Sequence, residues 1–305
     1  MISHNNSPLV SIVITTHNRP TLLKRAIDSA VGQTYPNTEI IVVDDASEKE
    51  TQTVCDQYKN IKYYYIPKEE SKGGNYARNL GIKASSGKYI SLLDDDDYWK
   101  SEKVEKQVNA LESNPQCGLC YTDYYREELC PDDSTILHEN KINRLFQGDM
   151  HAKIWACVLI TTSKFIVRRD LLIQVGLFDE ELRFWQDFEL LVRLAQVSAF
   201  INCCETLTII RDDHQEKGRL TNNYYDWLKA IKFINKKHKV LYSNAPIKYR
   251  IVYKIHVYGS GYTRASKHHL RKECIKMWCK AFPYRVLHKC SRWIQELKLP
   301  EEQVV

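Results

Sequence analysis

The sequence predicts an α/β fold in which a mainly parallel sheet is flanked by helices, with a helical extension at the C-terminus. Two observations carry this prediction. Apolar runs of strand length alternate with helical patterns through the first two hundred residues, as in parallel sheets covered on both faces. Beyond residue 214 the chain becomes basic, aromatic and helical. We therefore predict a first domain over residues 1–220 and a helical region over 221–305.

The individual elements follow from hydrophobic periodicity and from turn residues. Pro20 is expected to open the first helix, and Pro67 to end a strand at the edge of the sheet. The polar stretch 127–149 shows neither the helical nor the strand pattern of apolar residues, so we expect a mobile loop there. The predicted strands are 9–15, 39–43, 63–66, 89–93, 118–123 and 165–167, and the later predicted helices are 75–83, 101–111, 171–175 and 186–196.

The bulk composition is that of an ordinary globular protein of 305 residues, with 43% hydrophobic and 27% charged residues. No apolar run approaches the ~20 residues that span a bilayer. The first eight residues lack the basic and apolar regions of a signal peptide, so we expect a cytoplasmic location. The lone CxxC at 117–120 has no second pair at zinc-finger spacing and does not predict a zinc site.

Four consecutive aspartates, Asp94 to Asp97, follow the apolar run 89–93. Each close pair of like charges costs about 1 kcal/mol in water and about 4 kcal/mol near a protein surface. A divalent cation such as Mg²⁺ or Mn²⁺ would offset this repulsion, since these ions prefer oxygen ligands. The alternative is a solvated acidic turn or a helix N-cap. If a metal does bind, we expect Asp97 to cap the turn before Trp99 and not to be a ligand.

Polar residues also follow the first and second predicted strands, at 15–19 and 44–47. Ligands of open α/β sheets bind at the carboxyl ends of the strands, so these groups should meet the aspartates. Together they supply a hydroxyl, an imidazole, a cation and two acidic clusters, which suits a nucleotide and a metal. The chain has no GxGxxG or GxxxxGK[ST] loop, which argues against dinucleotide oxidoreductases and P-loop NTPases.

At these positions the chain resembles the family 2 glycosyltransferases of the GT-A fold. The similar segments occur in the family's order: 10–19, 41–47, 77–81, the DxD at 94–97, 175–180 and 185–190. The resemblance covers about residues 8–211 and does not extend to the basic tail. It implies a metal-dependent enzyme that transfers a sugar from a nucleotide-sugar, most simply a UDP-sugar, during bacterial surface-polysaccharide synthesis.

The resemblance implies a role for each matching residue. Thr15 and Asp45 would hold a uracil-type base, with His17 beside it, and Asn18 is a further candidate for binding the nucleotide. Arg19 and Arg78 would lie near the ribose or the diphosphate, and Asp94 and Asp95 would meet the ribose and the donor sugar. Asp96, the second acid of the DxD, would coordinate Mn²⁺ or Mg²⁺. His214 is a candidate nitrogen ligand or diphosphate contact, although a surface histidine is the simpler alternative.

Asp187 matches the family's catalytic base, although an aspartate at a helix start is also a common N-cap. A base on that side of the donor would give inversion, and hence a β-linked product from an α-linked donor. Burial beside Trp185 and Phe188 should raise the pKa of Asp187, as a general base requires. The family usually has Glu-Asp where this chain has Gln186-Asp187, and the loss of that acid should lower the pKa slightly.

The expected partners are the nucleotide-sugar donor and a glycan or polyprenyl-diphosphate-linked acceptor. A non-catalytic nucleotide-sugar or glycan-binding protein on the same scaffold is the alternative, but it would be expected to lack the DxD or the base. We do not expect nucleic-acid binding, since tail aromatics such as Tyr242, Tyr253 and Trp278 occur at irregular helical spacings that favour a core.

The basic tail leaves two alternatives open. It could attach the enzyme peripherally to an anionic surface at the inner face of the cytoplasmic membrane, through a helix carrying Lys272, Lys276 and Lys280 beside Ile275, Trp278 and Ala281. It could instead be an ordinary packed helical subdomain.

Overall fold

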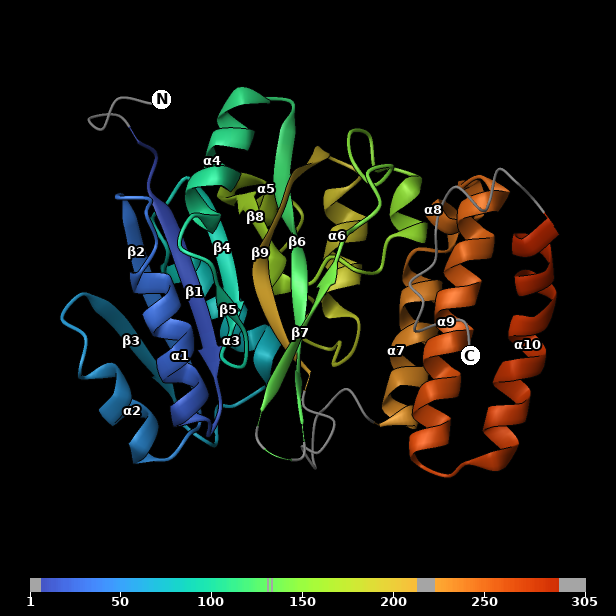
Figure 1. Cartoon of the computed structure of the whole chain (residues 1–305), viewed down its shortest axis with the longest axis horizontal. Helices are drawn as coiled ribbons and strands as arrows, with labels where there is room; N and C mark the ends of the chain where they lie inside the picture. The colour runs from blue at the N-terminus through green and yellow to red at the C-terminus, as the bar shows by residue number, and fades with distance from the viewer. Residues whose placement is uncertain (1–6, 131, 133, 213–222, 291–305) are drawn as a thin grey trace.

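The computed structural model describes residues 7–130, 132, 134–212 and 223–290. Within these residues the chain forms one curled, mainly parallel nine-stranded sheet flanked by helices, followed by a group of C-terminal helices (Figure 1). The strands are β1 Val10–Thr16, β2 Thr38–Asp45, β3 Ile61–Ile66, β4 Tyr89–Asp94, β5 Tyr98–Trp99, β6 Cys117–Leu129, β7 Thr135–Asn140, β8 Phe165–Arg168 and β9 Ala199–Asp212. The helices are α1 Pro20–Val31, α2 Lys49–Cys55, α3 Gly74–Ala84, α4 Lys103–Ser113, α5 Arg169–Gln174, α6 Gln186–Leu194, α7 Tyr224–Lys237, α8 Lys239–Asn244, α9 Ile247–Lys267 and α10 Arg271–Cys290.

The strand order is β3-β2-β1-β4-β8-β6-β9-β5, with β7 paired to β6 outside this path. The strands β3, β2, β1 and β4 run parallel to one another. Strand β8 is antiparallel to both β4 and β6, and β6 is parallel to β9. As expected, β3 lies at the edge. The parallel register brings the ends of β1, β2 and β4 to the same edge of the sheet, where the polar segments follow.

Helix α3 lies unusually close to the sheet because of Gly81. A Cβ atom at this position would lie 2.3 Å from Val13 Cγ1 on β1 and 3.1 Å from Val43 Cγ2 on β2. Only a glycine fits such an approach without displacing the strands. The close packing fixes the position of α3 and of Arg78, one turn earlier on the helix.

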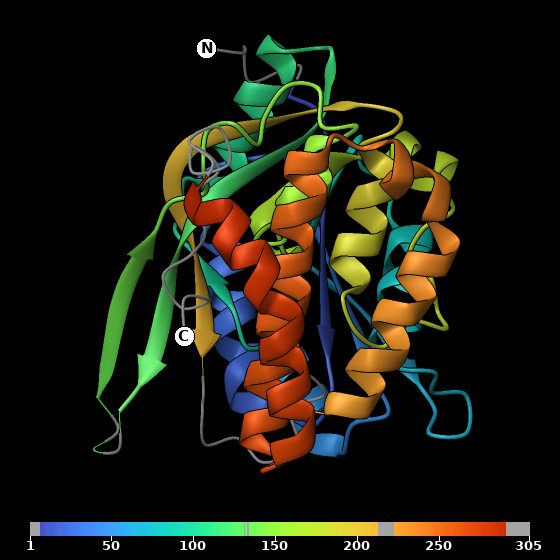
Figure 2. The ribbon, with the colours of Figure 1, turned by 90° about the vertical axis from the view of Figure 1, so that its right-hand side faces the viewer.

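The prediction of a mobile loop over 127–149 is wrong for its first part. Strand β6 continues to Leu129 and pairs with β7 in a hairpin that projects from the sheet (Figure 2). The polar side chains of this extension bind one another and their neighbours: Tyr98 Oη donates to Glu127 Oε1 at 2.8 Å, and Arg126 Nη1 lies 3.3 Å from Asp212 Oδ2. Polar contacts hold this hairpin in place, and neither strand buries an apolar face there. The sequence therefore lacks the alternation of apolar and polar residues that usually indicates a strand.

The C-terminal helices α7–α10 pack beside the sheet domain and share a hydrophobic cluster with it (Figures 1 and 2). The buried ring of Trp155 contacts Phe188 at a centroid distance of 5.8 Å, and Tyr242 and Tyr253 at 5.2 Å each. Packing of Tyr242 and Tyr253 is thereby confirmed, whereas Trp278 is 48% exposed. The boundary predicted near residue 220 lies outside the described residues. Within those residues, no helix has the length and hydropathy needed to cross a membrane.

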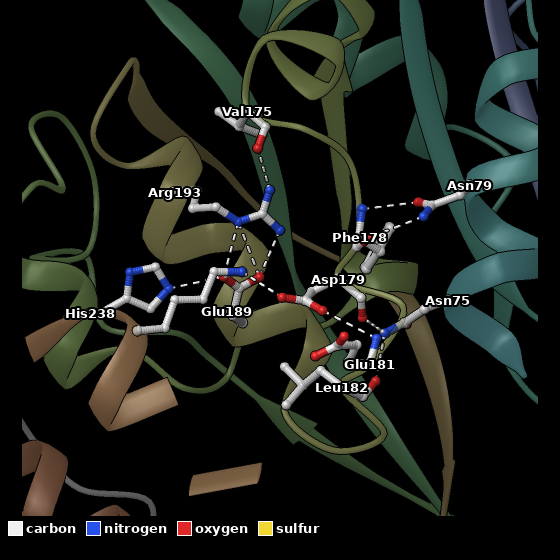
Figure 3. A network of polar contacts seen from close by, with 11 residues as sticks. Asn75, Asn79, Val175, Phe178, Asp179, Glu181, Leu182, Glu189, Arg193 and His238 are labelled. Atoms are coloured by element: carbon white, nitrogen blue, oxygen red, sulfur yellow. Dashed lines mark hydrogen bonds and ion pairs between the residues drawn. The ribbon is translucent and has the colours of Figure 1, made fainter. Parts of the chain in front are cut away.

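Glu189 on α6 connects the sheet domain to the tail through a buried ionic network (Figure 3). Its carboxylate lies 2.6 Å from Arg193 Nη2, 2.8 Å from Lys237 Nζ and 2.9 Å from His238 Nε2. Lys237 also lies 2.6 Å from Asp179 Oδ2. Burial by itself would raise the pKa of Glu189, but the hydrogen bonds from His238 and Arg193 outweigh it and lower the pKa to about 2.

Candidate active site

Asp94 at the end of β4 is held by two donors from other elements. Arg78 Nη2 on α3 lies 2.6 Å from Asp94 Oδ1, and Thr162 Oγ1 donates to Asp94 Oδ2 at 2.8 Å. Burial favours the neutral acid, but Arg78 and these hydrogen bonds outweigh it and lower the pKa of Asp94. Asp94 is therefore an ionised carboxylate of fixed orientation.

Asp95 is directed toward the end of β1. Thr16 Oγ1 donates to Asp95 Oδ2 at 2.7 Å, the backbone N–H of His17 reaches the same oxygen at 3.4 Å, and Arg19 Nη1 lies 3.1 Å from Asp95 Oδ1. Burial, followed by the neighbouring charge of Asp96, raises the pKa of Asp95 to about 6. The repulsion expected within the four aspartates is thus present in the structure.

Asp96 and Asp97 point to different surroundings. Asp96 Oδ2 lies 3.3 Å from Arg19 Nη1, and its side chain is 15% exposed. Asp97 does not cap the turn before Trp99 as expected; its Oδ1 accepts a hydrogen bond of 3.1 Å from the backbone N–H of Arg211 on β9. Burial and the charges of Asp96 and Asp94 raise the pKa of Asp97 well above its usual range. Asp97 therefore tethers the aspartates to β9.

The ends of β1 and β2 meet through His17, whose Nδ1 lies 2.5 Å from the backbone oxygen of Asp45. Asn18 adopts a left-handed conformation (φ 53°), and its backbone N–H donates to Ser47 Oγ at 2.8 Å. Thr15, half-buried, is in register with Asp94. Asp45 Oδ1 is buried and has no hydrogen-bond partner among the described residues. A buried carboxylate oxygen that lacks a donor can accept a hydrogen bond from an N–H or O–H group of a ligand.

Asp187 stands in the first turn of α6, two residues after an unusual backbone conformation. Trp185 has a left-handed backbone (φ 54°), a strained conformation for a bulky residue. Its ring packs edge-on against Phe188 at 5.3 Å. Burial raises the pKa of Asp187 to about 6, with Arg78 opposing and Asp94 reinforcing the rise. Asp187 Oδ1 is buried without a hydrogen-bond partner in the described part of the chain.

Two of the segments that resemble the family, 77–81 and 175–180, are joined by Asn79 (Figure 3). Asn79 Nδ2 donates to the backbone oxygen of Phe178 at 2.9 Å, and the backbone N–H of Phe178 donates to Asn79 Oδ1 at 2.9 Å. Asn75 Nδ2 similarly donates to the backbone oxygens of Asp179 and Leu182 at 2.7 Å each. Helix α3 thereby fixes the segment that leads into α6, so Arg78 and Asp187 are positioned by the same contacts.

The short helix Thr162–Lys164 was missed as a source of site residues. Besides the contact of Thr162 with Asp94, the backbone of Thr162 hydrogen-bonds Asp187. Lys164 is buried with its Nζ 3.3 Å above the ring of Tyr124, and burial lowers its pKa to about 7 against the opposing charges of Asp97 and Asp187. The signal in the sequence was the polar run 161–164 between two apolar segments.

The structure brings together ten of the eleven predicted site residues at one edge of the sheet. They are Thr15, His17, Asn18, Arg19, Asp45, Arg78, Asp94, Asp95, Asp96 and, beside them, Asp187. His214 lies outside the described residues. Within the described residues, no group of three or more His, Cys, Asp or Glu side chains could hold a metal ion by itself.

A family model described as "Glycosyl transferase family 2" matches residues 11–176. The chain belongs to this family. Membership of this family supports an enzyme, a glycosyltransferase, over the alternative of a non-catalytic binding protein on the same scaffold. The matched segment contains the ends of β1, β2 and β4 and Arg78, and it stops before Asp187.

Two curated relatives show how much of this chain has similar sequences in other proteins. An uncharacterized glycosyltransferase of Rickettsia prowazekii is 36% identical over 200 residues, which cover 63% of this chain and 60% of the relative. UDP-Glc:alpha-D-GlcNAc-diphosphoundecaprenol beta-1,3-glucosyltransferase WfaP of Escherichia coli is 36% identical over 120 residues, 39% of this chain and 47% of the relative. This chain thus spans less than two thirds of the length of either relative.

The fold is similar to that of Staphylococcus aureus TarS 1-349, whose structure was solved in complex with UDP-GlcNAc. The TM-score is 0.59 over 90% of this chain and 91% of TarS 1-349, at 14% sequence identity. The similarity extends well beyond the part covered by the family model. It confirms the GT-A architecture with C-terminal helices that the sequence predicted.

Proposed function

We propose that this glycosyltransferase moves a sugar from a UDP-sugar to a hydroxyl of a glycan or lipid-linked acceptor, with inversion and with a divalent cation. The observation that carries the proposal is a pair of buried carboxylate oxygens, Asp45 Oδ1 and Asp187 Oδ1, that lack partners among the described residues. Asp45 ends β2, two strands from β4, and Asp187 is close enough to Arg78 and Asp94 for their charges to shift its pKa. One is suited to accept from the base of a nucleotide, and the other from the hydroxyl that attacks.

Asp187 is the proposed general base. A base must be ionised at neutral pH yet hold a proton well enough to remove it from a hydroxyl, and a pKa of about 6 satisfies both conditions. Arg78 keeps the carboxylate from becoming fully neutral, while burial keeps it basic. Attack assisted from the face opposite the departing diphosphate would invert the anomeric carbon and give a β-linkage from an α-linked donor.

Asp96 is the proposed metal ligand. Asp96 is the second acid of the DxD, and its carboxylate lies beside Arg19, with Oδ2 3.3 Å from Nη1. One carboxylate completed by diphosphate oxygens and water is the mode of binding that Mg²⁺ favours, and Mn²⁺ accepts the same donors. Bound there, the cation would stabilise negative charge on the departing diphosphate. Arg19 and Arg78 would add positive charge on the same side.

The choice of donor and acceptor rests on the relatives. TarS binds UDP-GlcNAc, and WfaP uses UDP-Glc with a diphosphoundecaprenol-linked acceptor, as their names state. We propose UDP-hexoses and UDP-N-acetylhexosamines as donors and a glycan or polyprenyl-diphosphate-linked acceptor. A cytoplasmic location of the active site belongs to the same proposal, since nucleotide-sugars are the donors.

The proposal is tested with purified protein, Mn²⁺ and a set of UDP-sugars, by following UDP release with and without acceptor. Asp187→Asn should bind UDP with unchanged affinity in calorimetry but lose at least about a hundredfold in turnover. Glu181→Gln, an exposed acid before the same helix, is the matched control. Full turnover by Asp187→Asn would remove Asp187 as the base, and UDP binding without release by any donor would point to a different nucleotide-sugar.

A further inference from the structure

Helix α10 presents apolar residues on two opposite faces. Its inner face carries Met277 and Ala281, 3% and 2% exposed, and packs against α9. Ala281 was expected on the outer face together with Ile275 and Trp278, and that placement is wrong. A helix that is apolar on both sides ordinarily has a partner on both sides.

The outer face is an apolar stripe that no other described element covers. We call it the α10 stripe: Ile275, Trp278, Phe282 and Val286, exposed by 64%, 48%, 53% and 43%. The spacing of three, four and four residues places the four side chains in one line along the helix. The rings of Trp278 and Phe282 lie 5.4 Å apart, so the centre of the stripe is a continuous aromatic surface. In Figure 1, α10 is the outermost helix of the tail, on the side away from the sheet.

A row of lysines follows one edge of the α10 stripe. Lys272, Lys276 and Lys280 are exposed and recur every four residues, so they too form a line along the helix. The single acid within α10, Glu273, accepts from Tyr224 Oη at 2.6 Å and pairs with Lys276 at 3.3 Å. The exposed surface of this helix is therefore both apolar and positively charged.

We propose that the α10 stripe and its lysine row dock on the surface of an anionic lipid bilayer. Helices that lie in a membrane interface combine an apolar face containing Trp or Phe with flanking lysines, which meet the acidic headgroups. A second copy of the chain fits less well, because pairing two such faces brings lysine rows together and α10 has no unengaged acid to offset them. The inference is independent of the proposed transfer reaction.

The experiment measures co-flotation of the full-length protein with vesicles. At low salt the protein should float with phosphatidylcholine vesicles containing about 30 mol % phosphatidylglycerol, and at least about fivefold less with phosphatidylcholine alone. Raising the salt to about 0.5 M should release most of it, because charges at the surface are screened. Absence of flotation with the anionic vesicles would overturn the proposal.

Two pairs of variants separate the stripe from its surroundings. Trp278→Ser with Phe282→Ser should reduce flotation at least about tenfold, and the matched control Val31→Ser with Ile173→Ser, which alters residues 56% and 53% exposed on other helices, should not. Lys272→Glu with Lys280→Glu should abolish binding to anionic vesicles, whereas Lys49→Glu with Lys83→Glu should retain it.

Light scattering and nucleotide binding complete the test. If the wild type is a dimer that Trp278→Ser with Phe282→Ser converts to a monomer, the face belongs to a second copy and the lipid proposal is overturned. UDP binding, measured on the same samples, should be equal in all four variants and the wild type. Loss of UDP binding by a stripe variant would show that its effect is not confined to a docking surface, and would also count against the proposal.

Discussion

Arg78 Nη2 lies 2.6 Å from Asp94 Oδ1, and the same guanidinium is the neighbouring charge that most lowers the pKa of Asp187. A single cation thus serves carboxylates that come from β4 and from α6, more than ninety residues apart in the chain. Substitutions at Arg78 should therefore alter both the donor side of the site and the proposed base.

The first prediction concerns the pH dependence of turnover. With a pKa of about 6, Asp187 is ionised at neutral pH, so UDP release should be constant above that pH and fall as the pH decreases through 6. In Arg78→Gln the opposing positive charge is lost, so the pKa of Asp187 should rise and the acid limb should move to higher pH. The pH profiles of kcat for both proteins provide the measurement. An acid limb that stays in place or moves down would contradict this assignment.

The second prediction separates stability from metal binding. Asp96→Asn removes one charge from the four aspartates, so we expect the ligand-free protein to gain about 1 kcal/mol at pH 8. The pKa of Asp95, which Asp96 raises, should fall. The same variant should lose the Mn²⁺-dependent part of UDP affinity. Thermal unfolding and calorimetry measure these effects, with Asp56→Asn as an exposed control. If Asp96→Asn is less stable than the wild type, the expected relief of repulsion is wrong. If its UDP affinity still increases with Mn²⁺, Asp96 is not the metal ligand.

The third prediction concerns the network around Glu189. Glu189→Gln leaves Arg193, Lys237 and His238 without their buried counter-charge, and we expect a loss of about 3 kcal/mol at pH 7. The folded-state pKa of about 2 lies below the ordinary value of 4.5, so the stabilisation is complete above pH 4.5 and is lost as the pH falls toward 2. The difference between wild type and variant in urea unfolding should shrink over that range. An undiminished difference at low pH would mean that the contribution is not ionic.

The fourth prediction uses the close approach of α3 to the sheet. Gly81→Ala places a methyl group 2.3 Å from Val13 Cγ1, so α3 or β1 must move, and we expect a loss of about 1–3 kcal/mol. Because α3 carries Arg78, kcat should fall as well. Lys83→Ala, on the exposed side of the same helix, is the control for both measurements. A fully active and equally stable Gly81→Ala would show that the helix has room to adjust.

Most of the sheet and most of the site could be predicted because each depends on short-range patterns. The strands β1, β2 and β4 are buried on both faces, so their apolar runs are unmistakable, and each ends in polar residues that the parallel register must bring together. Asp45 and Asp94 follow from this alone. Asp187 does not, since its place beside Arg78 depends on the contacts of Asn79 across a separation of 99 residues. Its assignment from sequence needed the family resemblance.

The errors arose where polar residues are used structurally. The β6–β7 hairpin is stabilised by cross-strand polar contacts, so its sequence resembles a loop. The sequence places Asp97 in a turn, but in the structure its side chain accepts a hydrogen bond from the backbone N–H of Arg211 on β9, 114 residues later. Lys164 is buried among acids and an aromatic ring, an environment that no local pattern reveals. In each case a long-range partner determines the role of the side chain.

The packing of Trp185, which has a left-handed backbone, limits how the C-terminal helices of this protein can be replaced. Its ring contacts Tyr253 of α9 at a centroid distance of 6.2 Å, and Phe188, one turn into α6, stacks on the same tyrosine at 5.7 Å. The residues on both sides of Asp187 therefore pack against the tail. An exchange of the C-terminal helices between related enzymes would change the setting of the proposed base along with the surface that the helices present. The sheet domain and the tail therefore form one packed unit around the proposed base, and a chimaera that divides them would have to preserve these contacts.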